Sequence, residues 1–175
     1  GDPADFIEVE SWRNFRVRRT WIAGRLVAAQ GRTLLRRQPA RVVNKFRARP
    51  RRAADFAVAA GQGRLNVIAV FNGQLITRQL RLRAKVENGF IVADPARDVL
   101  KLALVNRYAP RAPIAVGFVR GFGLKSGALA SSVAHDSHNL VAVGTDDEAL
   151  AAAVNLVTAH RGGLSAVGAG RRSVL

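Results

Sequence analysis

The sequence predicts an α+β fold in which short strands outnumber helices, and three observations support this class. Several segments alternate apolar and polar residues, which is the pattern of a half-buried strand. Two Asn-Gly pairs, at 72–73 and 88–89, lie between such segments and are typical of tight hairpin turns. Residues 145–161 instead show a helical repeat of apolar residues behind a capping residue.

The first predicted sheet is small and lies within residues 5–35. Residues 5–9 begin a strand, and Phe15 to Ile22 alternates for several steps. Ala23-Gly24 can turn the chain because glycine accepts a positive φ, and Arg25 to Ala29 then returns as the second strand of a hairpin. So few strands do not form a stable sheet alone, and we expect them to need partners later in the chain or outside it.

An arginine-rich segment, residues 37–54, separates this sheet from the rest of the chain. Pro39 and Pro50 favour an irregular connection here. The simpler interpretation is a solvated linker, and the alternative is an arm that binds a partner through its arginines. We therefore expect a first part over residues 1–36 and a second domain over residues 55–175, joined by this linker.

The second domain is predicted to begin with an antiparallel meander over residues 55–107. Its expected strands are Leu65 to Phe71, Gln74 to Leu82, Lys85 to Glu87, Phe90 to Val92 and Val99 to Asn106. Ile114 to Val119 is a further buried strand. The small apolar residues 128–134 are expected to begin a helix or to form a tight loop packed under the sheet.

The clearest helix follows a short strand at Leu140 to Val143. Thr145 is the expected N-cap, and Glu148, three residues later, completes a capping box. One apolar stripe repeats at i, i+4 and i+7 through Leu150, Val154 and Val157. Gly162-Gly163 ends the helix, and Leu164 to Val167 is the next strand, so a β-α-β unit is expected near the end of the chain.

The composition restricts the class of protein. The chain has 175 residues, 49% of them hydrophobic, which is enough for a buried core. It has no cysteine, which excludes a disulfide framework and fits a cytoplasmic location. No apolar run is long enough to span a bilayer and no signal peptide is visible, so no membrane association is expected. The lack of methionine and the start at glycine suggest that the ends are not those of a full-length protein.

The net charge of +16 is concentrated in residues 1–52. A basic surface attracts phosphate backbones through counterion release, and it can equally face an acidic partner. The recognition-helix, zinc-finger and aromatic ribonucleoprotein patterns are absent, so nucleic acid is a disfavoured partner. The alternative function that stays open is a stand-alone, non-catalytic basic module that binds nucleic acid or an acidic protein.

Residues 131–139, Ser-Ser-Val-Ala-His-Asp-Ser-His-Asn, form the densest polar cluster. They lie between a glycine-rich segment and a buried strand, where loops often present functional groups. Because imidazole titrates near neutral pH and carboxylates exchange protons, the candidate catalytic residues are His135, Asp136 and His138. The candidate substrate-binding residues are Ser137 and Asn139.

Four roles for this cluster can be weighed from the residues alone. A metal site is disfavoured because zinc usually takes three or four placed ligands, and no other histidine lies close in sequence. A Ser-His-Asp triad is disfavoured because all its members would come from one short segment. A binding or proton-handling loop completed by another domain, and a structural loop that caps turns, are supported about equally.

The glycine-rich stretch 121–127, Gly-Phe-Gly-Leu-Lys-Ser-Gly, fits neither common phosphate-binding pattern. Ser126 stands where the dinucleotide pattern needs glycine, and Lys125-Ser126 precede the last glycine instead of following it. Tight turns and close backbone packing are the better explanation for these glycines.

Residues 94–108 and 121–148 closely resemble the C-terminal domain of bacterial adenine deaminases. The His-Asp-Ser-His-Asn block at 135–139 is specific to that family. Residues 1–35 are similar to the last strands of the small β-sandwich of amidohydrolases, in which a Gly-x-x-Ala-Asp start and a late Gly-Arg-Leu-Val hairpin recur. Together these resemblances cover nearly the whole chain.

The resemblance implies a short β-sandwich remnant followed by a β-rich domain with a terminal β-α-β unit. It implies a parent enzyme that hydrolyses adenine to hypoxanthine and ammonia in purine salvage, with a divalent metal (manganese, iron or zinc) in a (β/α)8 barrel. That barrel's ligands begin with a His-x-His pair, which is missing here. We therefore expect this chain alone to be inactive and to bind no metal.

The same resemblance implies the partners. They are the missing barrel of the same protein, adenine as the substrate of the parent enzyme, and further copies in a homo-oligomer. The cluster at residues 135–139 would face the mouth of the barrel, where it would bind the purine or relay protons.

Overall fold

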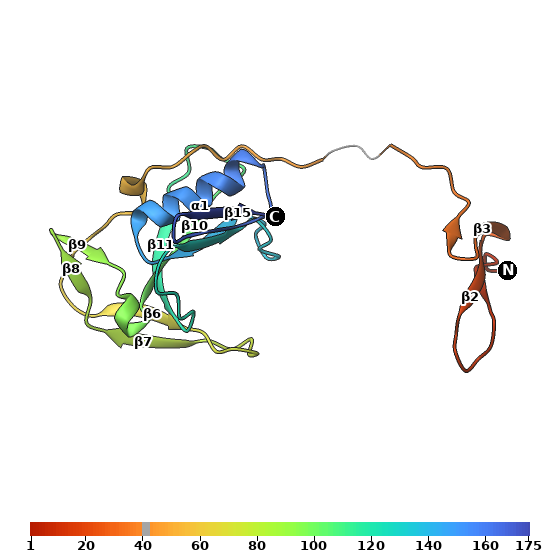
Figure 1. Cartoon of the computed structure of the whole chain (residues 1–175), viewed down its shortest axis with the longest axis horizontal. Coiled ribbons are helices and arrows are strands. Elements are labelled where there is room, and N and C mark those ends of the chain that lie inside the picture. The colour runs from red at the N-terminus through yellow and green to blue at the C-terminus, as the bar shows by residue number, and fades with distance from the viewer. Residues whose placement is uncertain (40–42) are drawn as a thin grey trace. The chain divides into compact units, whose positions relative to one another are not determined.

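The computed structural model describes residues 1–39 and 43–175 and divides into two compact units, Gly1–Val43 and Asn44–Leu175 (Figure 1). In the described part of the chain, the regular structure is mostly strand, with one α-helix and two short 3-10 helices. The predicted α+β class is confirmed. None of the described helices is long and apolar enough to cross a membrane.

The first unit is an antiparallel sheet of four strands in the order β1-β2-β3-β4. The strands are β1 (Phe6–Val9), β2 (Val17–Ile22), β3 (Arg25–Ala29) and β4 (Arg32–Thr33). Ala23 and Gly24 both have positive φ and form the predicted β2–β3 turn. The strand expected from Phe15 starts later, because Phe15 also has a positive φ and belongs to the preceding turn. Among the described residues of this unit, Val27 is the one buried hydrophobic residue.

Part of the segment expected to be a solvated linker, residues 37–54, belongs to the second unit. From Asn44 onward the chain belongs to the second unit, whereas residues 40–42 lie outside the described residues. Asn155 on helix α1 (Asp147–Ala159) accepts a hydrogen bond from the Arg51 amide at 2.7 Å and donates one to the Arg51 carbonyl at 2.8 Å. Phe46 and Ala48 pack against the core. The hydrogen bonds attach the segment to α1, and its apolar side chains cover part of the core beside the helix.

The second unit contains an eight-stranded sheet in the order β15-β14-β12-β13-β10-β11-β6-β7. Its strands are β6 (Leu65–Ala69), β7 (Arg78–Leu82), β10 (Leu100–Val105), β11 (Ala115–Arg120), β12 (Ala128–Ser131), β13 (Leu140–Gly144), β14 (Leu164–Gly168) and β15 (Arg171–Val174). A separate sheet has the order β5-β9-β8 and contains β5 (Val58–Ala59), β9 (Phe90–Val92) and β8 (Lys85–Glu87). Neighbouring strands are antiparallel except β6 and β11, which are parallel.

The meander expected over residues 55–107 is wrong in its connections. β8 and β9 form the hairpin expected at Asn88-Gly89, but their further partner is β5. β10 pairs with β11 and β13, which come later in the chain. The connection at Asn72-Gly73 is also longer than expected, since β7 begins at Arg78. Local turn signals do not reveal pairing between strands that are distant in sequence.

Residues 128–134, expected to be helical or a tight loop, instead begin with strand β12, which continues to Ser131. β12 is antiparallel to both β13 and β14, so β13 and β14 run parallel to each other on either side of it. Helix α1 connects β13 to β14 and packs on one face of the sheet (Figure 1). The strand–helix–strand unit therefore joins two strands that have β12 between them in the sheet. β15 follows β14 in the chain and pairs with it.

Helix α1 begins one residue later than the sequence suggested. The N-cap is Asp146, whose carboxylate accepts a hydrogen bond from the Ala149 amide at 2.7 Å. The hydroxyl of Thr145 instead donates to the Gly127 carbonyl at 3.2 Å. The expected capping box between Thr145 and Glu148 is therefore wrong, because the neighbouring aspartate caps the helix.

The main core lies between α1 and the sheet. Its buried members are Phe56, Ala103, Val105, Ala128, Ala130, Leu140, Ala142, Leu150, Ala151, Ala153, Val154 and Val157. The predicted apolar stripe of the helix is confirmed, since Leu150, Val154 and Val157 are fully buried. The 3-10 helix η1 (Ala53–Phe56) contributes the Phe56 ring.

A buried ion pair fixes the start of α1 to the sheet. Lys101 on β10 is 1% exposed, and its ammonium donates to the two carboxylate oxygens of Asp147 at 2.7 and 2.9 Å. The same ammonium donates to the Phe56 carbonyl at 3.1 Å. One cation therefore connects β10, η1 and the first turn of α1.

Asp94 caps the 3-10 helix η2 (Pro95–Arg97) and forms an ion pair with Arg97 at 2.6 Å. The hydrogen bond from the Arg97 side chain lowers the pKa of Asp94, and partial burial opposes this effect. A carboxyl whose pKa is lower in the folded state stabilises the fold above its unfolded pKa of about 3.9. This contribution is lost as the pH falls through the lower, folded value.

We therefore expect Asp94→Asn to be less stable than the wild type near neutral pH and to approach it at a pH below the lowered pKa of Asp94, where the wild-type carboxyl is protonated. Asparagine keeps an oxygen that can cap η2, so the variant isolates the effect of the charge. Urea unfolding midpoints at the two pH values measure the difference. A difference that did not change with pH would show that the ionisation of Asp94 does not stabilise the fold.

Candidate functional site

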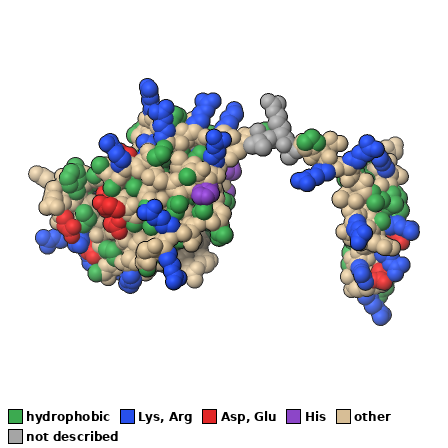
Figure 2. Space-filling view, turned by 45° about the horizontal axis from the view of Figure 1, so that its top comes forward, with side chains coloured by type: hydrophobic (Ala, Val, Ile, Leu, Met, Phe, Trp, Pro, Cys, Tyr) green, Lys and Arg blue, Asp and Glu red, His purple; other side chains and the backbone are tan. Residues whose placement is uncertain are grey.

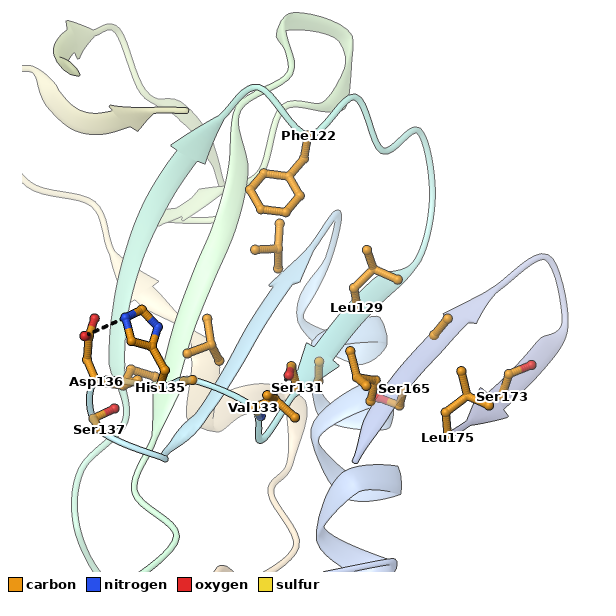
Figure 3. Close-up of a pocket in the computed structure, with 17 residues that line it drawn as sticks. Phe122, Leu129, Ser131, Val133, His135, Asp136, Ser137, Ser165, Ser173 and Leu175 are labelled. Carbon is orange, nitrogen blue, oxygen red and sulfur yellow. Dashed lines mark hydrogen bonds and ion pairs between the residues drawn. The ribbon is translucent and has the colours of Figure 1, made fainter. Parts of the chain in front are cut away.

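The face of the eight-stranded sheet opposite α1 carries a depression of about 740 Å³ (Figure 3). Apolar side chains of four neighbouring strands form its floor, and we call these residues the open face: Leu104, Leu129, Val141, Val143, Leu164 and Ala166. Side chains alternate between the two faces of a strand, so the residues between them, such as Ala103 and Ala142, pack under α1.

The glycine-rich loop 121–127 lies at one end of the depression and presents Phe122 (Figure 3). The carboxylate of Asp98 accepts hydrogen bonds from the amides of Gly121 and Gly123, both at 2.8 Å, and so holds this loop in place. A Cβ atom at Gly121 would collide with the Val70 carbonyl. The interpretation of these glycines as turn and packing residues is confirmed.

The polar loop, residues 132–139, borders the other end of the depression. His135, Asp136 and Ser137 line it, and the imidazole Nε2 of His135 lies 3.1 Å from the carboxylate of Asp136. Their side chains are 94% and 89% exposed. The pair can therefore exchange protons or form hydrogen bonds with a molecule that approaches from outside.

The other two candidates, His138 and Asn139, do not line the depression. His138 has a φ of 52°, and its amide donates to the Ala134 carbonyl at 2.6 Å, which closes the turn of the loop. Asn139 accepts a hydrogen bond from the Arg107 amide at 3.2 Å through its side-chain oxygen. Of the five candidate residues, three therefore line the depression, while His138 and Asn139 make contacts that hold the loop.

The described residues do not fit a metal site. In residues 1–39 and 43–175, no three His, Cys, Asp or Glu side chains gather closely enough to hold an ion. His135 and Asp136 together offer two donors, and a zinc site usually needs more protein ligands. That this chain binds no metal stays a prediction.

The sequence patterns did not reveal the open face or Phe122. A signal was present, because Val99 to Asn106 is almost continuously apolar, and such strands have both faces covered.

Figure 2 shows histidine side chains at the surface of the larger unit beside hydrophobic ones, and Lys and Arg side chains projecting from both units.

Residues 74–174 match the family model of the adenine deaminase C-terminal domain. The chain belongs to the adenine deaminase family. A protein named adenine deaminase from Salinibacter ruber is 53% identical over 170 residues, which cover 97% of this chain and 31% of that protein. One from Methanothermobacter thermautotrophicus is 44% identical over all of this chain and 33% of its own length. One from Methanosarcina barkeri is 41% identical over 94% of this chain and 31% of its own length.

The chain thus spans about a third of the length of the adenine deaminases it matches. The match to the adenine deaminase C-terminal domain includes the whole open face, the glycine-rich loop 121–127 and the polar loop. The two stretches that resembled this family, residues 94–108 and 121–148, both lie inside the match, so that resemblance is confirmed.

Proposed function

We propose that this chain is the accessory C-terminal region of an enzyme that hydrolyses adenine to hypoxanthine and ammonia. The observation that carries the proposal is the match of residues 74–174 to the adenine deaminase C-terminal domain. Relatives named adenine deaminase are about three times longer than the chain, which leaves room for a catalytic part elsewhere. In the reaction, water adds to the carbon that bears the amino group, and the amino group leaves as ammonia.

We place the catalytic metal (manganese, iron or zinc by family resemblance) in that other part. The sequence supports this placement, because it has no His-x-His pair to begin a ligand set. We also infer a cytoplasmic enzyme of purine salvage that forms a homo-oligomer. The absence of cysteine agrees with a reducing compartment.

We propose that the first unit is part of the small β-sandwich of the same enzyme. Phe6, Ile7 and Ile22 are each about half exposed on a sheet that buries little of its own surface. The stacked rings of Phe6 and Trp21, 4.7 Å apart at their centroids, lie on the opposite face from Ile7, because neighbouring residues of a strand point to opposite faces. A second sheet packed over either face would remove the apolar side chains of that face from water, as in other sandwiches.

We propose that the polar loop contacts adenine or relays protons in the intact enzyme. The geometry that supports this role is the exposed His135–Asp136 pair beside Ser137, on a loop whose turn His138 and Asn139 hold. We propose a catalytic role for His138 and a substrate-binding role for Asn139, because both residues belong to the family-specific block at 135–139.

Replacing His135 by asparagine in the intact enzyme is expected to lower kcat/KM for adenine by about a hundredfold, the usual scale for loss of an acid–base group. His138→Asn is expected to lower it less, because the His138 side chain does not line the depression. Asparagine tolerates the left-handed backbone that His138 adopts, so the loop keeps its turn. The readout is steady-state release of ammonia from adenine, with thermal unfolding recorded alongside.

The matched control is His160→Asn, because His160 is the third histidine of the chain and caps α1, where its Nδ1 lies 2.9 Å from the Leu156 carbonyl. We expect this variant to keep the wild-type kcat/KM. Unchanged kinetics in both loop variants would remove the two loop histidines from the active site. No ammonia release by the intact wild-type polypeptide would refute the proposed function itself.

A further inference from the structure

The open face differs from the rest of the same side of the sheet. In β6 and β7, three of the side chains on this side are polar: Asn66 lies opposite Arg81, and the Gln79 amide donates to the Asn66 side chain at 3.2 Å. These residues are exposed, as expected for a sheet surface in water. The polar side chains therefore lie on β6 and β7, and from Ile68 on β6 onward this side of the sheet is apolar.

The strand register places the two regions on one side of the sheet. Ile68, which pairs with Gln79, lies beside Val119 of β11. Val119 pairs with Leu100 of β10, and Leu100 alternates with Leu102 and Leu104 along that strand. The polar and apolar regions therefore lie on one side of the sheet, and Leu100 and Val119 between them are buried in a cluster with Val70 and Leu124.

The apolar region continues across four strands without a charged side chain. One row runs from Leu104 through Val141 and Ser131 to Leu164, and a second runs from Leu102 through Val143 and Leu129 to Ala166. Leu129 and Leu164 are 42% and 50% exposed, and Phe122 at the rim is 45% exposed. A continuous apolar surface of this kind marks an interaction site more often than a solvated surface.

We propose that the open face is the docking surface for the catalytic part of the same adenine deaminase polypeptide. This inference rests on the proposed function. The relatives carry about two thirds of their length outside the region matched by this chain, so the occupant is present on the same polypeptide at a high effective concentration. Docking there removes the leucines and Phe122 from water, which is the main driving force for such association.

The position of the polar loop agrees with this occupant. His135, Asp136 and Ser137 line the same depression as Leu104 and Leu129 (Figure 3). A catalytic domain that covers the apolar floor would therefore come against these polar side chains at the edge of the contact. The loop can then act at the boundary between the two parts of the enzyme, where the proposed function needs it.

Cysteine labelling tests the docking surface directly, because the chain has no cysteine of its own. Leu129→Cys and Leu164→Cys place a thiol on the open face, and Gln79→Cys places one on the polar region of the same sheet. Each variant is prepared as the 175-residue chain and within the intact enzyme, and is reacted with iodoacetamide. Mass spectrometry of the peptide that carries the new cysteine gives the labelling rate at each site.

We expect Leu129→Cys and Leu164→Cys to react at least about tenfold more slowly in the intact enzyme than in the 175-residue chain, because an opening step must precede labelling. Gln79→Cys should react equally fast in both. Equal rates for the two open-face variants would overturn the proposal. Protection that is already present in the 175-residue chain and increases with its concentration would also overturn it, since a second copy would then cover the face.

The labelling experiment can fail or succeed separately from the test of the proposed function. Labelling measures whether the face is covered, and ammonia release measures whether adenine is hydrolysed. Protection without deaminase activity would support docking and refute the function, whereas activity without protection would do the reverse.

Discussion

Replacing Asp147 by alanine is expected to lower the free energy of unfolding by about 3–5 kcal/mol, the usual result of removing one partner of a buried ion pair. The substitution leaves the ammonium of Lys101 without its carboxylate at a position that is 1% exposed. The Phe56 carbonyl remains as an acceptor at 3.1 Å, but it does not neutralise the charge. The start of α1 should then separate from β10 and η1.

Glu148→Ala is the matched control for this variant. Glu148 is also an acid in the first turn of α1, but its side chain is exposed. Its loss should cost about 0.3–1 kcal/mol through the helix dipole alone. Urea unfolding, followed by circular dichroism, measures both variants. Equal costs for the two substitutions would contradict a stabilising role for the buried pair.

A double variant separates the buried charge from other effects of the substitution. Lys101→Met combined with Asp147→Ala removes both charges and fills the buried position with an apolar side chain. Because an uncompensated buried charge is the main penalty, the double variant should be more stable than Asp147→Ala alone. If it were less stable, the hydrogen bond from Lys101 to the Phe56 carbonyl would be the more important contact.

Gly127→Ala is expected to lower the free energy of unfolding by at least about 3 kcal/mol, from backbone strain and overpacking together. Gly127 has a φ of 85°, and an added Cβ would collide with the Val167 carbonyl of β14. That backbone cannot move aside without separating β12 from β14, which pair from Ala128 to Ser131. Leu129 and Ala166 would lose their register across the open face.

Gly89→Ala provides the comparison, because Gly89 has a φ of 80° and an added Cβ there meets open space. This substitution should cost about 1 kcal/mol, from backbone strain alone. Thermal unfolding of both variants gives the difference that close packing contributes at Gly127. In the intact enzyme, Gly127→Ala should also increase iodoacetamide labelling at Leu129→Cys. Equal unfolding costs would mean that the strands at Gly127 move apart easily.

Local patterns in the sequence predicted the elements better than their arrangement. The β2–β3 turn at Ala23-Gly24, the hairpin at Asn88-Gly89 and the apolar stripe of α1 all depend on residues within a few positions of one another. The helix cap was misplaced by one residue because Thr145 and Asp146 are both good caps, and their hydrogen bonds to Gly127 and Ala149 decide between them.

Family membership was also readable from the sequence, through the block at residues 135–139 and its flanks. The sequence did not show which of the candidate residues line the site. All five candidate residues are consecutive, but the fold separates those that line the depression from His138 and Asn139, which hold the loop. Adjacent residues of a turn point in different directions, and sequence order does not show which.

By itself, the sequence determined the α+β class, the local turns, the helix and the family of this protein, because each depends on short-range patterns or on identity along the chain. Only the tertiary structure decided that β12 lies between β13 and β14, that residues 44–54 cover the core, and that the open face is one continuous apolar surface. Each of these arises from contacts between residues far apart in sequence. Such contacts depend on strand order and register, which alternation within a single strand does not specify.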